Sequence, residues 1–122
     1  MSDANARPAW TYRAGVAHAL IGQTLLFLSI HPLRELLDAQ ALTMVQTMSA
    51  VQIGNGLALM LLARTAGGRL APMLIALGTL ASAAMIWIIA FTGTHPFDLI
   101  VPIGGLAMIV GWIVVLVREG RP

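Results

Sequence analysis

The stretch of residues 45–64, VQTMSAVQIGNGLALMLLAR, constrains the fold more than any other part of the chain. It is apolar enough to enter a membrane, yet its first half carries several polar side chains. At the helical step of about 100° per residue, these side chains lie on or beside one face. An amide that faces lipid has no hydrogen-bond partner, so we expect this face to point at other helices of the protein or at a partner protein. The polar residues are Gln46, Ser49, Gln52 and Asn55.

The composition indicates a membrane protein. The chain has 122 residues, of which 58% are hydrophobic and 10% charged, and its mean hydropathy of +0.86 is too high for a soluble domain of this length. There is no cysteine, which excludes disulfides, thiolate metal sites and thiol catalysis. All seven basic residues are Arg, scattered singly or in pairs, and they form no clustered basic face of the kind that binds nucleic acid.

Four apolar stretches are long enough to cross a hydrocarbon core of about 30 Å, the first of them only at the short limit. They predict an all-α polytopic membrane protein, an antiparallel four-helix transmembrane bundle. Polar tails, residues 1–13 and 118–122, enclose a single domain of residues 14–117. The expected spans are residues 14–30, 42–63, 70–91 and 99–117.

A short amphipathic segment is expected between the first two spans. His31 and Pro32 end the first span, and leucines then recur at helical spacing opposite charged residues. This pattern indicates a short helix that lies at the membrane interface or forms the lead-in turn of the second span. Pro32 suits the start of such a helix.

Small residues predict close helix packing in the second half of the chain. Gly78 is followed four residues later by Ser82, and Ala107 is followed four residues later by Gly111, a spacing that allows backbones to approach. We expect Gly105 to lie at a close approach as well, together with Gly78 and Gly111.

The arginines predict the orientation. Six of the seven flank the same side of the four expected spans, and only Arg34 lies on the other side. Basic residues are enriched in cytoplasmic loops, so both termini are expected to be cytoplasmic. No formal charge falls inside an expected span, which disfavours a voltage sensor or a carboxylate proton relay.

Two blocks resemble a family of small four-span bacterial membrane proteins, the domain of unknown function four hundred and twenty-three, to which a small eukaryotic transmembrane protein is related. The first is HPLRELLDAQALTMVQTMSAVQIGNGLALMLL, and the second is AFTGTHPFDLIVPIGGLAMIVGWIVVLV, with its Pro-Ile-Gly-Gly run. The resemblance covers residues 14–117. The matching residues are His31, Asp38, Ala41, Leu42 and Gln52 in the first block, and Thr92, Gly93, Pro102, Ile103, Gly104, Gly105, Gly111 and Trp112 in the second.

The resemblance implies a four-helix fold and a location in the bacterial inner membrane. It implies no activity, because none is established for the family. The chain departs from the family pattern at Pro32, where a Gly is usual, and at Val51, Gly54 and Asn55, which replace aromatic and His residues around the Gln of the second span. Any binding role of those family residues is not carried over.

Two His-Pro pairs are candidate metal ligands. His31 and His95 are both expected outside, and with Glu35, Asp38 and Asp98 they form a metal or haem-edge cluster if the two loops meet. A His before Pro is more commonly a cap or interface residue, and flexible loops lack rigid ligand geometry. We therefore predict no metal, no cofactor and no catalytic residue. His18 is expected to hydrogen-bond a neighbouring helix or to snorkel.

The polar stripe and Pro102 each allow two interpretations. The stripe lines a path for water or substrate, or it holds helices together, and uncharged amides favour the second interpretation. Pro102 with Gly104 and Gly105 breaks the last span to bind an ion, or simply starts the helix, and again the second role is commoner. We expect Gln52 to point into the bundle. Its expected partners are Gln23, Thr24, Ser82 and the carbonyls near Pro102.

Two function classes follow. The first is a structural or accessory subunit that packs against itself, as a homo-oligomer, or against a larger membrane protein complex. The second is a small-molecule or ion binding or transport unit with a polar path beside the second span. An enzyme is not expected, because no nucleophile with its base and no carboxylate pair falls within a span. The lipid bilayer is the expected surrounding, and nucleic acid is not an expected partner.

Overall fold

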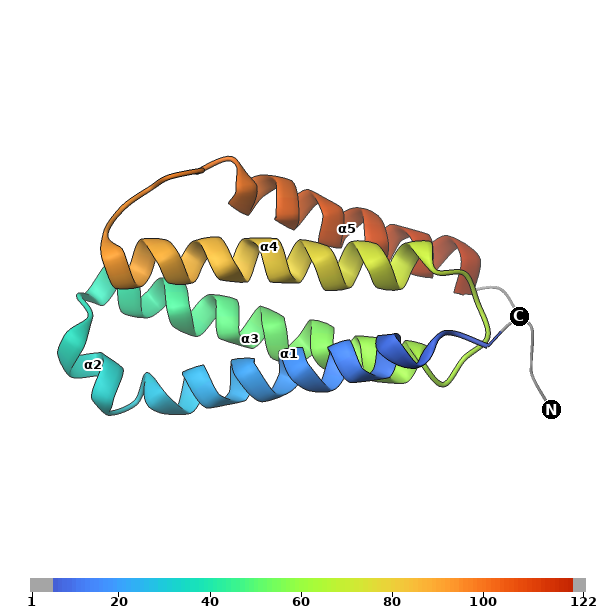
Figure 1. Ribbon diagram of the computed structural model, residues 1–122, viewed down its shortest axis with the longest axis horizontal. Coiled ribbons are helices and arrows are strands. Elements are labelled where there is room, and N and C mark those ends of the chain that lie inside the picture. Colours follow the sequence, from blue (N-terminus) through green and yellow to red (C-terminus); the bar gives the residue numbers. More distant parts are fainter. Residues whose placement is uncertain (1–5, 120–122) are drawn as a thin grey trace.

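The computed structural model describes residues 6–119, with the side chains of residues 6–118, and the described chain is almost entirely helical (Figure 1). This confirms the expected all-α class. Within these residues the only β pairing is an isolated antiparallel bridge between Ala6 and Ala66. The helices are α1 (Ala9–Leu28), α2 (Pro32–Leu36), α3 (Ala39–Leu62), α4 (Leu70–Thr92) and α5 (Ile100–Glu119).

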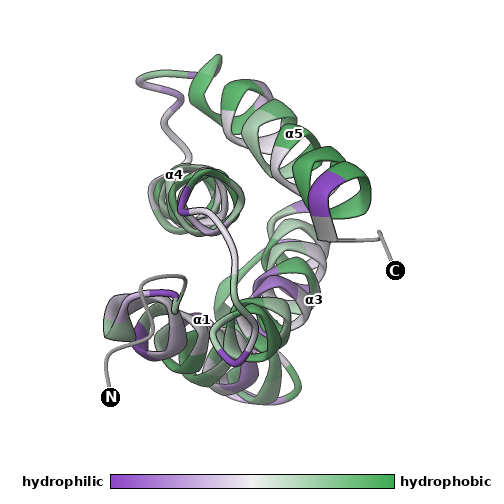
Figure 2. Ribbon diagram, turned by 90° about the vertical axis from the view of Figure 1, so that its right-hand side faces the viewer, coloured by the Kyte–Doolittle hydropathy of each residue, from purple (hydrophilic) through white to green (hydrophobic). Residues whose placement is uncertain are grey.

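The four long helices form two antiparallel pairs. α1 packs along α3, α4 packs along α5, and α3 joins the pairs by packing against α4 (Figure 1). Seen end-on, α4 lies between α5 and the α1–α3 pair (Figure 2). α1 and α4 run parallel to each other and touch only slightly.

Three of the described helices, α3, α4 and α5, are long and apolar enough to cross a membrane. α1 does not meet that standard of apolarity. It begins at Ala9 rather than at residue 14, so Tyr12 and Arg13 lie within its first turns, and His18 and Gln23 lower the hydropathy of the rest. The expected tail of residues 1–13 is therefore helical from Ala9, and α5 likewise extends into the expected tail of residues 118–122 as far as Glu119.

Among the three candidate spans, the more apolar a helix is, the smaller is the buried share of its residues. Buried residues make up 44% of the apolar segment of α3, the least apolar of the three, and only 11% of that of α5, the most apolar. A membrane-spanning segment that faces lipid has no need to bury apolar side chains, whereas polar side chains need protein partners. The order of burial fits a protein that is solvated by lipid.

Local signals set the ends of the helices. The carboxylate of Asp38 accepts a hydrogen bond of 2.8 Å from the backbone N–H of Ala41, so α3 starts at Ala39, three residues before the expected start of the second span. α4 ends at Thr92 and is followed by Gly93, whose φ of 71° lies in the left-handed region that suits glycine. α2 is a separate helix of 5 residues, and Pro32 is its first residue. Of its residues only Leu33 is buried.

Glycines bring α1 and α3 into backbone contact. A Cβ added at Gly15 would lie 2.6 Å from the carbonyl oxygen of Gly56, and one added at Gly56 would lie 2.6 Å from the carbonyl oxygen of Gly15. Further along, a Cβ at Gly22 would lie 2.8 Å from the carbonyl oxygen of Ser49. No side chain fits at these positions, so the α1–α3 pair depends on glycine there.

A second set of glycines brings α4 and α5 together. A Cβ at Gly78 would lie 2.6 Å from the carbonyl oxygen of Gly104, and a Cβ at Gly111 would lie 2.7 Å from the side chain of Ile75. The expected close approach at Gly105 is wrong, because a Cβ there would meet nothing within 4 Å. Successive residues of a helix point about 100° apart, so only one of the adjacent glycines can face α4, and it is Gly104.

Two apolar clusters lie toward the two ends of the bundle. One is formed by Leu59 and Leu62 of α3 with Ile75 and Ala76 of α4, and partly buried residues of α1 and α5 pack against it. The other joins Leu33, Val45 and Ala90 near α2. The polar side chains of α3 lie between the two clusters.

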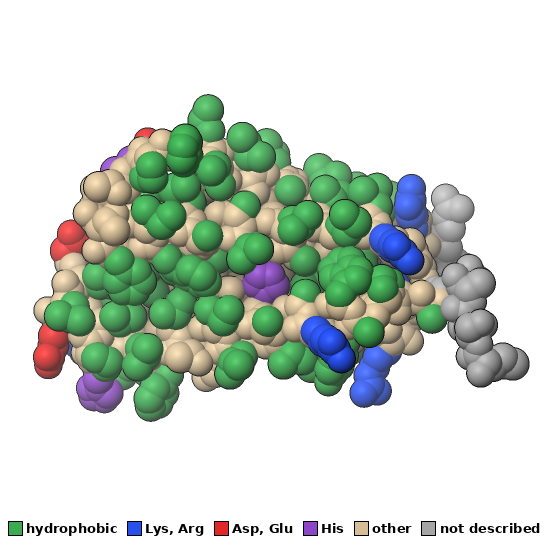
Figure 3. Space-filling model, viewed as in Figure 1, with side chains coloured by type: hydrophobic (Ala, Val, Ile, Leu, Met, Phe, Trp, Pro, Cys, Tyr) green, Lys and Arg blue, Asp and Glu red, His purple; other side chains and the backbone are tan. Residues whose placement is uncertain are grey.

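The segment before α1 is fastened to the α3–α4 connection by Arg7. The buried guanidinium donates 2.9 Å to the carbonyl of Leu62 and 3.1 Å to that of Gly68, and also 2.6 Å to the hydroxyl of Thr65. A cation at the C-terminal end of α3 also complements the helix dipole. Most of the described basic side chains lie at this end, and the described acidic ones gather at the other end (Figure 3).

Candidate functional site

The polar stripe of α3 lies inside the bundle, as predicted. Ser49 and Gln52 are completely buried, Asn55 is buried and Gln46 is half-buried. Each of the three amides hydrogen-bonds a residue of another helix or connection. The stripe is therefore an interhelical layer, and its contacts decide what it can do chemically.

Gln52 connects three helices through His18. Its side-chain Nε2 lies 3.0 Å from Nδ1 of His18, and Nε2 of His18 lies 3.2 Å from the carbonyl oxygen of Ala76. A carbonyl only accepts, so Nε2 of His18 carries the ring proton and Nδ1 accepts from the amide. The resulting chain of two hydrogen bonds runs from α3 through α1 to α4, with the imidazole neutral.

The partner of Gln52 differs from the four predicted ones. Gln23 and Thr24 are exposed, and Thr24 donates to the carbonyl of Leu20 in its own helix. Ser82 donates 2.9 Å to the carbonyl of Val101 in α5. The prediction that Gln52 points into the bundle and bonds a side chain of another helix is confirmed. The expectation that His18 bonds a neighbouring helix is confirmed as well.

Asn55 is the junction between the two helix pairs. Its Nδ2 donates 2.9 Å to the hydroxyl of Thr79 in α4 and lies 3.0 Å from the sulfur of Met108 in α5. Its Oδ1 accepts from the indole N–H of Trp112, also in α5, at 3.1 Å. One side chain of α3 thus uses both its donor and its acceptor groups on the second pair.

The other two stripe residues make fewer contacts between helices. Gln46 donates 3.2 Å to the hydroxyl of Ser29, which itself donates to the carbonyl of Leu26. The hydroxyl of Ser49 is buried without a hydrogen-bond partner, and so is Oε1 of Gln52. The hydroxyl of Ser49 and one acceptor of Gln52 therefore remain unused in an otherwise paired layer.

The layer does not line an open path. The described part of the chain has five surface hollows of about 230 to 460 Å³. The residues that line them do not include Gln46, Ser49, Gln52 or Asn55. The stripe residues themselves therefore border none of these five hollows, as expected for polar side chains that hold helices together, whereas His18, the partner of Gln52, borders one of the hollows between α1 and α4.

Pro102 starts α5 without breaking it. The helix runs continuously from Ile100 to Glu119, and the backbone N–H of Ile103 donates to the carbonyl of Leu99. The interpretation of a discontinuous helix that binds an ion is wrong. Instead, the carbonyl of Val101 accepts from Ser82 and so helps to fix the first turn of α5 against α4.

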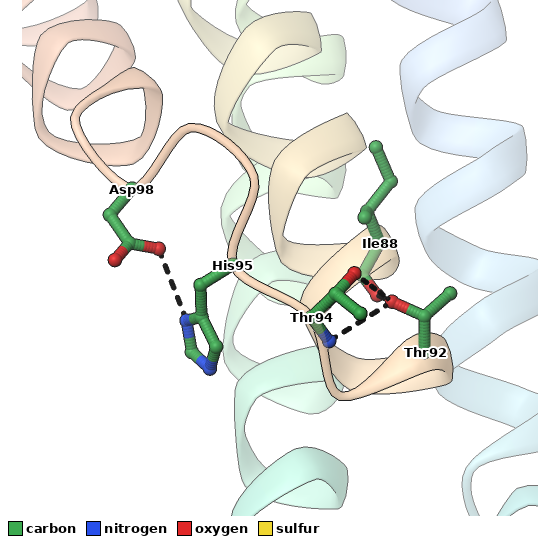
Figure 4. Close-up of polar contacts among 5 residues, drawn as sticks. All are labelled: Ile88, Thr92, Thr94, His95 and Asp98. Carbon is green, nitrogen blue, oxygen red and sulfur yellow. Dashed lines mark hydrogen bonds and ion pairs between the residues drawn. The ribbon is translucent and has the colours of Figure 1, made fainter.

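The two predicted histidines of the loops do not combine. His95 pairs with Asp98 at 3.1 Å in the α4–α5 connection, beside the hydroxyls of Thr92 and Thr94 (Figure 4). His31 is exposed at the start of α2. Within residues 6–119, no three His, Cys, Asp or Glu side chains come together as a metal ion would require.

His18 is the site residue whose role the sequence left open. It lies on the buried face of α1, where Thr11, Gly15, His18 and Gly22 follow each other at steps of four and three residues. That spacing was readable in the sequence, and glycines on a helix face mark where another helix approaches. The His on that face was therefore the natural partner for an amide of α3.

The site thus consists of hydrogen bonds between uncharged side chains that are buried between helices. Its described side chains offer no nucleophile beside a base. Comparison of the chain with protein-family models, with curated proteins and with solved structures finds no match.

Proposed function

We propose that the protein is a multi-pass membrane protein that serves as a structural or accessory subunit and packs against a second copy or against a helix of a larger membrane complex. The observation that carries this proposal is an exposed face of small residues on α3. Thr47, Ala50 and Gly54 follow each other at steps of three and four residues, and all three are exposed. We name these three residues the free α3 face.

The free α3 face has the chemistry of the glycine contacts inside the bundle. A Cβ at Gly54 would meet nothing within 4 Å, whereas one at Gly56, two residues later, would collide with α1. In an exposed helix interior, Gly costs about 1 kcal/mol relative to Ala and gains nothing from lipid. Ala50 and Gly54 have the small-xxx-small spacing that lets a helix from another chain approach closely.

The polar layer supports the same function. The amides of Gln52 and Asn55 bond His18, Thr79 and Trp112, so they hold the bundle together. The alternative function, binding or transport along a polar path beside α3, is less well supported, because none of the described hollows reaches these amides.

We propose that α1 is the fourth span. Its 20 residues are about 30 Å long at 1.5 Å per residue, which matches the hydrocarbon core. Of its polar side chains, Thr11 and His18 face the bundle, whereas Gln23 is exposed among apolar residues such as Leu20 and Phe27. α2 then lies at the membrane interface between α1 and α3, and the bundle has four spans.

The distribution of arginines supports cytoplasmic termini. Arg7, Arg13, Arg64, Arg69 and Arg118 all flank the end of the bundle where α1 starts and α5 ends, and Arg34 lies at the other end. By the positive-inside rule the first end is cytoplasmic. A bacterial inner membrane is the setting that the family resemblance implies. A reporter that is active only in the cytoplasm, fused after Pro122, should be active, and activity of an export-dependent reporter at that point would contradict the orientation.

The experiment that tests the subunit role uses Gly54→Leu. The protein is crosslinked in native membranes, purified in mild detergent, and its covalent partners are identified by mass spectrometry. Gly54→Leu should abolish a crosslinked species that the unaltered protein forms, while the thermal stability of the monomer stays unchanged, because the position is open within the chain.

The matched control is Ala17→Leu, which adds similar bulk to an exposed position of α1. It should leave the crosslinked species intact. Loss of the species in both variants, or its survival in Gly54→Leu, contradicts the assignment of the free α3 face as the packing surface. A protein that forms no crosslinked species at all contradicts the subunit role itself.

A further inference from the structure

A lateral groove of about 360 Å³ opens between α1 and α4, where these two parallel helices barely touch. Its walls are apolar along nearly their whole length, and its polar groups gather at the end where both helices begin. The residues that matter here are Trp10, Ala14, His18, Arg69, Leu77 and Leu80.

The polar groups at the mouth of the groove are donors only. Arg69 offers guanidinium N–H groups and Trp10 offers an indole N–H, and neither side chain has an acceptor. His18 adds no free polar atom, because Nδ1 is engaged by Gln52 and Nε2 by the carbonyl of Ala76. A ligand that satisfies this groove therefore carries its acceptors at one end and is apolar along the rest.

The charge at the mouth selects an anionic ligand. Arg69 is exposed, and the described acidic side chains, Glu35, Asp38 and Asp98, lie in α2 or in the connections at the opposite end of the bundle. Figure 3 shows acidic side chains gathered at one end. Arg69 also immediately precedes α4, so the positive end of that helix dipole adds to its charge. Basic pockets between helices on the cytoplasmic side suit anionic headgroups.

The length of the groove matches one leaflet of a bilayer. It extends along α4 from Arg69 to Leu80, eleven residue steps, which is roughly 16 Å at 1.5 Å per residue. Half of a hydrocarbon core of about 30 Å is about 15 Å. An acyl chain whose headgroup lies at Arg69 would thus run along the groove and end near the middle of the bilayer.

We propose that this groove binds an anionic phospholipid of the leaflet at the arginine-rich end, with its phosphate at Arg69 and one acyl chain between α1 and α4. The second hollow between these helices provides an internal contrast. Leu20, Thr24, Trp87 and Phe91 line it with no charged residue, so it has no basis for headgroup selection. The lipid site takes the membrane setting from the proposed function but does not depend on a protein partner.

The test is native mass spectrometry of the full chain in mild detergent, titrated with phosphatidylglycerol and with phosphatidylcholine of the same acyl chains. The unaltered protein should bind phosphatidylglycerol about tenfold more tightly, the scale of one charge-assisted hydrogen bond. Arg69→Gln should reduce this preference to near unity. Arg64→Gln is the matched control, an exposed arginine at the same end that does not line the groove, and it should keep the preference.

A second pair of variants tests the acyl chain. Ala14→Leu narrows the groove and should weaken the binding of phosphatidylglycerol, whereas Ala17→Leu on the same helix lies outside it and should not. Equal binding of the two lipids, or an equal loss in Arg69→Gln and Arg64→Gln, overturns the proposal in favour of a diffuse charge effect. Oleate that binds more tightly than phosphatidylglycerol, and loses affinity in Arg69→Gln, overturns the choice of a phospholipid.

Discussion

The two helix pairs, α1 with α3 and α4 with α5, are held together by different kinds of contact. Between α1 and α3, backbone contact at Gly15, Gly22 and Gly56 is combined with the buried hydrogen bond from Gln52 to His18. Between α4 and α5 the contacts are mainly those of glycines, and among the described side chains a single hydrogen bond joins these helices, from Ser82 to the carbonyl of Val101. The first pair is polar inside, and the second is almost wholly apolar.

This difference indicates which contacts hold helices together in lipid. Lipid solvates leucine as well as protein does, so apolar burial alone holds no helix in place. α5 accordingly remains mostly exposed although it is the most apolar helix, and its position depends on backbone contact and on Asn55. We expect the α1–α3 pair to be the more stable of the two.

The largest effect is expected at the closest contact of the first pair. Gly56→Leu places a side chain against the backbone of α1 and should lower the free energy of unfolding by about 3 kcal/mol or more. Unfolding in mixed micelles, followed by circular dichroism, measures the change. Gly54→Leu is the control, because that position of α3 is open. Similar losses in both variants would mean that the α1–α3 contact is looser than described.

A smaller effect is expected in the second pair. Gly104→Ala adds a Cβ that meets the hydroxyl of Ser82 and lies 2.7 Å from the carbonyl oxygen of Gly78, which should cost about 2 kcal/mol in the same unfolding assay. Gly105→Ala meets nothing and should be neutral or slightly stabilising, because Ala favours the helix. A cost at Gly105 equal to that at Gly104 would show that α5 packs with a different face toward α4.

The smallest effects are expected in the polar layer. Asn55→Leu leaves the indole N–H of Trp112 unpaired and should cost about 1 kcal/mol. Gln52→Leu leaves Nδ1 of His18 without its donor but also removes Oε1, a buried acceptor without a partner, so it should cost only about 0.6 kcal/mol. The intrinsic fluorescence of the protein should change in Asn55→Leu more than in Gln52→Leu. The reverse order of costs would mean that the link from Gln52 to His18, rather than the junction at Asn55, holds the two pairs together.

The sequence alone predicted the helices and the direction of the polar stripe well. Apolar length and helical spacing are properties of single segments, so they identified α3, α4 and α5 and placed Gln52 inside. The ends were less accurate. α1 starts at Ala9 because a helix in a protein extends beyond the apolar run that marks it, and α3 starts at Ala39 because Asp38 caps it.

The hydrogen-bond and packing partners of a residue were harder to predict than the direction in which its side chain points. A hydrogen bond between Gln52 and His18 forms only if α3 and α1 are aligned so that both residues lie at the same depth. The sequence of a single helix does not show how it is aligned with another helix. The choice between Gly104 and Gly105 has the same origin, although the spacing of seven residues from Gly104 to Gly111 places those two on one face and was a usable clue. Whether His31 and His95 meet was left open, because the sequence does not contain the distance between their two loops.

The fastening at Arg7 has a consequence for the order in which the chain becomes fixed during synthesis. The carbonyls that Arg7 binds belong to Leu62 and Gly68, which follow it by 55 and 61 positions. A ribosome delivers the N-terminal segment first, so Arg7 has none of these acceptors while α1 alone has emerged. It acquires them only when α3 has returned to the same side of the bundle. Arg7 therefore makes these contacts only after α1 and α3 have come together, so its attachment follows the formation of the first hairpin.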